Sequence, residues 1–167
     1  DFAKSGGLKS GELALVVSDK AGAYGLTRAE KASIPTLVIA ADKSLEITAR
    51  KAKFEAELQS ALEAAGIEMI VLAGFMRILS ADFVSKWENR IINVHPSLIP
   101  SFCGEGFYGL KVHEQALARG VKVTGATAHF VNEVCDGGPI IIQKAVEIQN
   151  GDTPEILQKR GGMENSS

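Results

Sequence analysis

Short apolar runs alternate with longer amphipathic segments along this chain, and this alternation constrains the fold more than any other feature. Apolar runs predict buried strands at residues 13–17, 36–40, 69–73 and 90–94, followed by two longer β segments at 123–131 and 140–148. Helical spacing predicts helices at 23–32, 45–65, 81–87, 113–119 and 152–160. Repeated β-α-β units of this kind indicate an α/β fold with an open, mostly parallel sheet and helices on both faces. Because only a short loop joins the last two β segments, we expect that pair to be antiparallel.

The composition is that of an ordinary globular protein and argues against several classes of function. Of the 167 residues, 46% are hydrophobic and 23% are charged, and a formal net charge of −2 gives no basis for nucleic-acid binding. No apolar run approaches the roughly 20 residues of a membrane span. Cys103 and Cys135 form no C-x-x-C pair, which favours free thiols in a reducing compartment such as the cytoplasm. The three histidines lack the spacing of a helical zinc site, so we expect no metal.

An asparagine and a histidine, Asn93 and His95, stand where an apolar strand runs into a proline. Residues two apart in an extended chain point to the same side, so these side chains project together while Val94 turns away. Pro96 keeps His95 extended, because the residue before a proline avoids the helical region. An amide donor beside an imidazole suits a reaction in which a carbonyl oxygen becomes negative while a proton moves nearby.

Further polar segments follow the predicted strands, where open α/β sheets bind their ligands. Residues 74–79 follow the third apolar run, residues 132–136 follow a β segment, and Lys51 lies near the start of the helix after the second run. Asp136, with two glycines behind it that allow a tight turn, is the carboxylate we pair with His95.

Each of these residues also has a purely structural interpretation. On their own, Asn93 and His95 are more often structural than catalytic, and Asp136 is a common turn residue. Arg77 and Lys51 suit a solvated surface equally well. His129 alternates with other side chains along one strand face, which favours a satisfied, partly buried histidine over a ligand.

Four segments together resemble the folate-dependent formyltransferases. They are residues 72–79 (LAGFMRIL), 92–100 (INVHPSLIP), 127–131 (TAHFV) and 136–141 (DGGPII), within a resemblance that extends over about residues 12–160. The resemblance implies the Rossmann-like formyltransferase fold. It also implies transfer of a formyl group from the co-substrate 10-formyltetrahydrofolate to the amine of glycinamide ribonucleotide in de novo purine biosynthesis. The implied partners are therefore small molecules.

The same resemblance assigns roles to residues by their positions. Asn93, His95 and Asp136 match the family's catalytic trio: Asn93 and a protonated His95 would stabilise the oxyanion, and Asp136 would support the imidazolium. Lys51 stands where the family commonly has a basic folate contact. The residues implied to bind folate are Lys51, Met76, Arg77, Ile78, Leu79, Asn93, Asn132, Glu133, Val134, Cys135 and Asp136.

The resemblance predicts one formyltransferase domain over residues 1–167. It implies that the fold's first strand, with its phosphate-binding loop, is missing from this chain, and that the chain is truncated or altered after about residue 160. The alternatives are a formyltetrahydrofolate hydrolase, a methionyl-tRNA formyltransferase and a non-catalytic folate-binding fragment. Pro96 stands where the tRNA enzyme usually has alanine, which argues against that enzyme. The sequence leaves open whether the chain forms a homo-oligomer.

Overall fold

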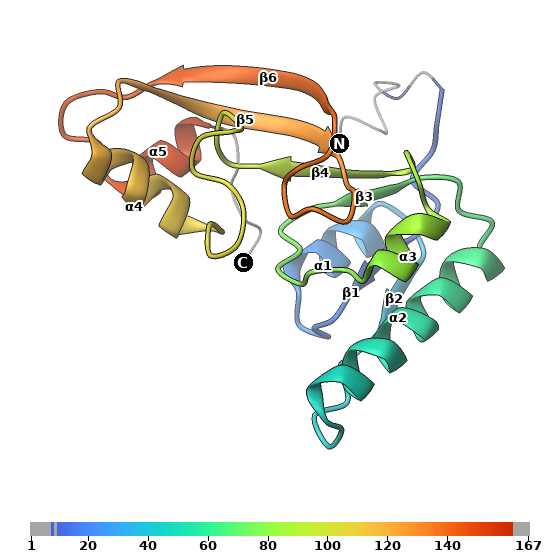
Figure 1. Ribbon diagram of the computed structural model, residues 1–167. Coiled ribbons are helices and arrows are strands. Elements are labelled where there is room, and N and C mark those ends of the chain that lie inside the picture. Colours follow the sequence, from blue (N-terminus) through green and yellow to red (C-terminus); the bar gives the residue numbers. More distant parts are fainter. Residues whose placement is uncertain (1–7, 9, 162–167) are drawn as a thin grey trace. The chain divides into compact units, whose positions relative to one another are not determined.

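The computed structural model describes residues 8 and 10–161, which form two compact units (Figure 1). Within the described residues, the first unit ends at Ile67 and the second begins at Glu68. We describe each unit by itself. Most of the segment expected to depart from the family after about residue 160 lies outside the described residues.

The first unit contains one parallel β-α-β motif followed by a long helix. Strands β1 (Val16–Ser18) and β2 (Thr36–Val38) pair in parallel, with α1 (Tyr24–Lys31) between them in the chain. Helix α2 (Ile47–Ala64) buries Phe54, Leu58 and Leu62, which recur at helical spacing. Gly66 follows it with φ +64°, so the predicted glycine stop is confirmed.

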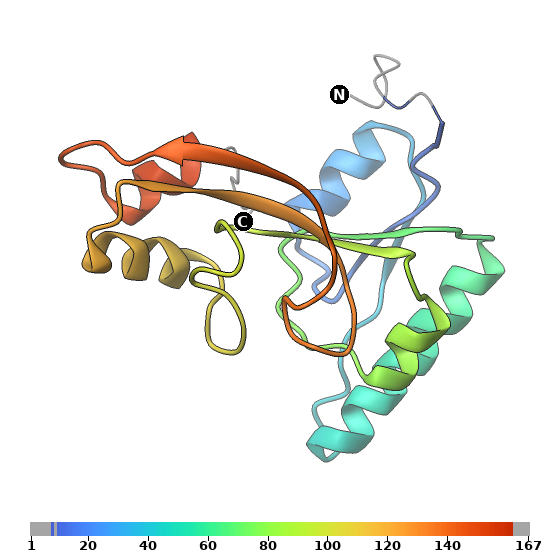
Figure 2. The same ribbon diagram turned by 45° about the horizontal axis from the view of Figure 1, so that its top comes forward.

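The second unit is built on a four-stranded mixed sheet (Figures 1 and 2). Its strand order is β3 (Ile70–Leu72), β4 (Ile91–His95), β5 (Val123–Phe130) and β6 (Ile140–Glu147). Strands β3 and β4 run parallel, whereas β5 runs antiparallel to both β4 and β6. The α/β class and the antiparallel last pair are confirmed. The antiparallel pairing of β4 with β5 was not predicted, because a helix between two strands usually indicates a parallel crossover.

Three helices accompany this sheet, and local signals in the sequence set their ends. Helix α3 (Ala81–Lys86) begins at Ser80, whose hydroxyl accepts a hydrogen bond from the Phe83 amide at 3.2 Å. Helix α4 (Leu110–Arg119) starts three residues before the predicted helix and ends at Gly120, with φ +76°. Helix α5 (Pro154–Arg160) has Thr153 as its N-cap.

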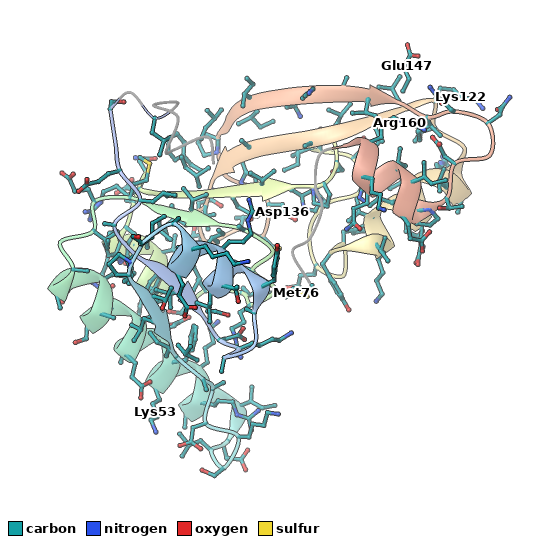
Figure 3. The ribbon with its side chains drawn as sticks, turned by 180° about the vertical axis from the view of Figure 1, so that it is seen from behind. Lys53, Met76, Lys122, Asp136, Glu147 and Arg160 are labelled. Carbon is teal, nitrogen blue, oxygen red and sulfur yellow. The ribbon has the colours of Figure 1, made fainter. Side chains whose placement is uncertain are left out.

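The end of α5 is fixed to the sheet through one arginine. The Arg160 guanidinium, which lies near Glu147 in Figure 3, donates to the Glu147 carbonyl at the end of β6 at 3.2 Å. It also forms an ion pair with Asp152. Leu157 on the same helix is only 1% exposed and belongs to the core. Among the described residues, no helix is both long enough and apolar enough to cross a membrane.

The register of β4 against β5 decides which side chains share a sheet face. Asn93 lies opposite His129, and His95 lies opposite Thr127. Because side chains alternate along a strand, these four residues project from one face, while Val94 lies on the other and is 45% exposed. The predicted common side of Asn93 and His95 is confirmed.

Thr127 fixes the segment that follows β4. Its buried hydroxyl donates to the Ser97 carbonyl at 2.7 Å and accepts from the Ile99 amide at 3.1 Å. The Gln143 side chain on β6 donates to the same hydroxyl at 3.0 Å. One side chain thereby holds the chain just beyond His95.

We predict that Thr127→Val lowers the free energy of unfolding by about 1–3 kcal/mol, because it leaves buried polar groups without a partner. Thr124→Val is the matched control. Thr124 lies on the same strand and is 4% exposed, and its hydroxyl has no hydrogen-bond partner within the part of the chain that the structure describes. Urea denaturation measures both variants. Equal losses of stability for the two would show that the hydroxyl contacts of Thr127 are unimportant.

Candidate active site

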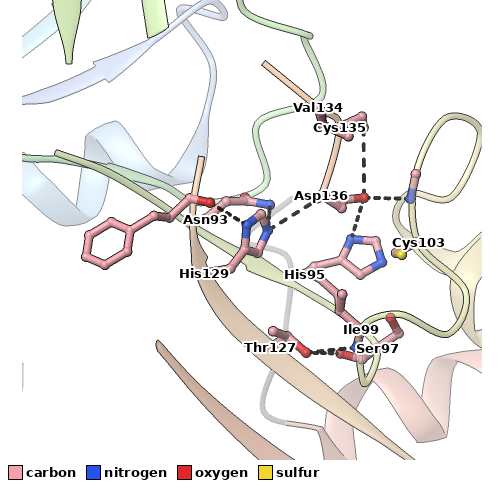
Figure 4. Close-up of polar contacts among 12 residues, drawn as sticks. Asn93, His95, Ser97, Ile99, Cys103, Thr127, His129, Val134, Cys135 and Asp136 are labelled. Atoms are coloured by element: carbon pink, nitrogen blue, oxygen red, sulfur yellow. Dashed lines mark hydrogen bonds and ion pairs between the residues drawn. The ribbon is translucent and has the colours of Figure 1, made fainter. Parts of the chain in front are cut away.

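His95 is buried at the end of β4 with both ring nitrogens facing acceptors. The side chain is 5% exposed, and Nε2 lies 2.8 Å from the Phe102 carbonyl oxygen. Nδ1 lies 3.5 Å from Oδ2 of Asp136 (Figure 4). A carbonyl and a carboxylate can only accept hydrogen bonds, so a protonated imidazole satisfies both contacts.

The loop that carries Asp136 approaches His95 from a direction that the sequence did not predict. From the sequence, its segment was expected at the carboxyl rim of a parallel sheet, but β5 is antiparallel and ends beside the start of β4. The loop of residues 131–139 therefore folds back toward the sheet (Figure 2). Asp136 occupies the left-handed region with φ +53°, and the Phe130 amide donates to the Pro139 carbonyl at 2.9 Å, which closes the loop.

Gly138 permits this return. A Cβ atom at this position would lie 1.8 Å from the Phe130 carbonyl oxygen, far inside van der Waals contact. The Asp-Gly-Gly sequence predicts a tight turn, and the close approach of two backbone segments is the physical reason for its second glycine.

The Asp136 carboxylate has four partners. Oδ2 accepts from the Gly104 amide at 2.9 Å and from the Cys135 thiol at 3.9 Å, and it faces His95. Oδ1 lies 3.6 Å from Nε2 of His129. Burial by itself raises the pKa of Asp136. The contact with His129, the Gly104 amide and the charges of the two imidazoles outweigh that effect, so the pKa falls below its usual value. Asp136 is therefore ionised at neutral pH.

His129 belongs to the same cluster, which the sequence did not reveal. The interpretation of His129 as a satisfied, buried histidine is correct but incomplete. The residue is 1% exposed and its Nδ1 lies 2.9 Å from the Phe130 carbonyl, yet its Nε2 also lies 3.3 Å from the Asn93 amide nitrogen. The contact with Asp136 raises the pKa of His129, against the opposing effect of burial. Only the register of β4 against β5 could have identified it.

Asn93, His95, His129 and Asp136 thus form one buried polar cluster. It combines an amide, two imidazoles and an ionised carboxylate, which are groups suited to stabilising a developing negative charge and to moving a proton. Among the described residues, no group of three or more histidine, cysteine, aspartate or glutamate side chains is arranged to hold a metal ion.

Sequence comparison identifies the family. A family model described as "Formyl transferase" matches residues 1–167. The chain belongs to the formyl transferase family.

Similar members of the formyl transferase family include single enzymes and one domain of larger proteins. The chain is 48% identical over 149 residues to the trifunctional purine biosynthetic protein adenosine-3 of Gallus gallus, covering 89% of this chain and 14% of that protein. It is 39% identical over 160 residues to the phosphoribosylglycinamide formyltransferase of Escherichia coli (strain K12), covering 96% and 71%. The crystal structure of glycinamide ribonucleotide transformylase 1 from Symbiobacterium toebii matches with a TM-score of 0.84 and 42% identity, covering 95% and 70%.

The residues that the formyl transferase resemblance assigns to folate lie in four places along the chain. Asn93 is on β4. Met76, Arg77, Ile78 and Leu79 follow β3, and Asn132, Glu133, Val134 and Cys135 precede Asp136 in its loop. The Asn132 side chain accepts from the Val134 amide at 3.0 Å, which shapes the start of this loop. Lys51 is half-buried on α2 of the first unit, and the structure describes it only within that unit.

We predict that Gly138→Ala lowers the free energy of unfolding by about 1–3 kcal/mol, because the new methyl group displaces the loop that carries Asp136. Gly25→Ala is the matched control, since a Cβ there meets nothing within 4 Å. Gly25 lies inside α1, where alanine is favoured over glycine by about 1 kcal/mol. Urea denaturation measures both variants. Unchanged stability in Gly138→Ala would contradict the close approach at this glycine.

Proposed function

We propose that this chain catalyses formyl transfer from 10-formyltetrahydrofolate to the primary amine of glycinamide ribonucleotide, a step of de novo purine biosynthesis. The observation that carries the proposal is the arrangement of Asn93, His95 and Asp136, which lie within one polar cluster. The names of the Escherichia coli and Symbiobacterium toebii relatives support the choice of acceptor.

In the proposed reaction, the amine nitrogen attacks the formyl carbon and the bond from that carbon to the folate nitrogen breaks. The formyl oxygen carries negative charge between these two events, so fixed donors and positive charge near it accelerate the reaction. Asn93 supplies the donor through its side-chain amide. His95 supplies the positive charge, because its two hydrogen-bond acceptors suit the protonated ring.

One proton must leave the attacking amine, and one must reach the departing folate nitrogen. We assign this transfer to His95 together with Asp136, either directly or through a water molecule. The lowered pKa of Asp136 keeps it ionised, so the proton held by the neighbouring ring remains next to a negative charge. No covalent bond between substrate and protein is required.

We place the folate against the two loops of the second unit. Met76, Ile78 and Val134 are 68%, 58% and 58% exposed, so a flat heterocycle laid on them would remove apolar surface from water. The backbone of residues 132–136 would supply hydrogen bonds to its polar edge. The role of Lys51 as a basic folate contact stays a prediction that rests on the resemblance alone.

We assign the reaction to the cytoplasm. Cys103 and Cys135 are free thiols, as expected in a reducing compartment. The proposed partners are the two small-molecule substrates.

We predict that Asp136→Asn lowers the rate of formyl transfer at least about 100-fold, because a neutral amide no longer supports a protonated His95. Folate affinity should remain nearly unchanged, since the loop backbone is retained. A coupled assay with glycinamide ribonucleotide measures turnover, and fluorescence titration measures folate binding.

Asp82→Asn is the matched control, because it removes the same charge from an exposed side chain in the first turn of α3. Its turnover should equal that of the wild type. Unchanged turnover in Asp136→Asn would refute the role of the carboxylate. Formate release without glycinamide ribonucleotide would instead favour a formyltetrahydrofolate hydrolase, and folate binding without either reaction would favour a non-catalytic module.

A further inference from the structure

His129 has one ring nitrogen whose hydrogen bond is fixed and one whose partner depends on protonation. Nδ1 lies 2.9 Å from the Phe130 carbonyl oxygen, which only accepts hydrogen bonds. Nδ1 therefore carries a proton in both charge states of the ring. Nε2 is the nitrogen that gains or loses a proton.

The two neighbours of Nε2 favour opposite protonation states of this nitrogen. The Asn93 amide nitrogen, 3.3 Å away, is a donor and requires an unprotonated Nε2. Oδ1 of Asp136, 3.6 Å away, is an acceptor and favours a protonated Nε2. One protonation state cannot satisfy both contacts.

The side chain of Asn93 can resolve this conflict by a half-turn. The oxygen and nitrogen of an amide have nearly the same shape, so exchanging them changes hydrogen bonding with little change in packing. A protonated Nε2 selects the amide oxygen of Asn93 and leaves its N–H groups for another partner. An unprotonated Nε2 binds an N–H group and turns the amide oxygen away.

From this geometry we infer that His129 is a positioning residue whose protonated ring turns the Asn93 N–H groups toward the substrate. The inference rests on the proposed formyl transfer, in which Asn93 donates to the formyl oxygen. Loss of the proton from His129 would present an oxygen where the reaction needs a donor, and loss of one such donor costs about 10²–10³ in rate.

The surroundings of His129 favour the protonated ring. Asp136 supplies the negative charge from its loop, while His95 on β4 contacts the other oxygen of that carboxylate. Across the sheet, β6 places the apolar Ile140 opposite His129. The raised pKa of His129 extends the protonated state above the usual range of a histidine. Turnover should therefore be lost as pH rises through that raised value.

The first experiment compares pH profiles of turnover. His129→Gln retains a neutral N–H donor for Asn93 but cannot titrate. We therefore expect it to keep most of the kcat and to lose the alkaline limb of the pH profile, which is the fall in turnover that the wild type shows at high pH. His129→Leu has no donor and should lose kcat about 100-fold with little change in KM. An unchanged alkaline limb in His129→Gln would overturn the inference.

His113→Gln is the matched control. His113 is also 1% exposed, and neither of its ring nitrogens has a hydrogen-bond partner among the described residues. Burial, together with the charge of His95, lowers the pKa of His113, so the ring is unprotonated at neutral pH. We expect His113→Gln to keep the alkaline limb of the wild type. If this variant also loses it, the limb cannot be assigned to His129 specifically.

The second experiment needs neither a variant nor catalysis. NMR of the ¹⁵N-labelled wild-type protein follows the ring nitrogens of His129 and the side-chain NH₂ of Asn93 over pH. We expect the Asn93 signals to shift with the same midpoint as Nε2 of His129. An Asn93 amide that stays unchanged while His129 titrates would overturn the inference alone, whereas a wild-type protein without formyl transfer would overturn the proposed function alone.

Discussion

The carboxylate of Asp136, held between two buried imidazoles, is the interaction on which the rest of the site depends. Its oxygens lie 3.5 Å from His95 and 3.6 Å from His129, and the Gly104 amide donates to one of them. Its negative charge raises the pKa of His129. The carboxylate therefore links His95 to His129, and through His129 to the orientation of Asn93.

This interaction depends in turn on the backbone. The antiparallel strand β5 brings His129 opposite Asn93, and the loop after it must double back for Asp136 to meet both rings. Gly138 allows the loop to pass close to the backbone of Phe130. The Thr127 hydroxyl donates to the Ser97 carbonyl and so fixes the segment that follows His95. The polar cluster is thus held by backbone contacts on both sides, which favours a preorganised site.

Local features were predictable from the sequence and long-range pairing was not. The common side of Asn93 and His95 follows from the two-residue period of a strand, and the end of α2 follows from Gly66. The direction of β5 was missed because the preceding helix suggested a parallel crossover. Because the direction of β5 was missed, the pairing of His129 with Asn93 could not be predicted. The direction from which the loop of Asp136 approaches the sheet was missed for the same reason. The folate contacts of residues 76–79 and 132–135 stay a prediction.

Titration of the Asp136 carboxyl carbon by ¹³C NMR tests the central claim most directly. If two imidazoles and the Gly104 amide surround this carboxylate, its pKa must lie below the ordinary value near 3.8 despite its burial. Replacing His129 with glutamine should then move the Asp136 pKa upward. A wild-type Asp136 that titrates at or above the ordinary value would contradict the account, because burial would then prevail over the two rings.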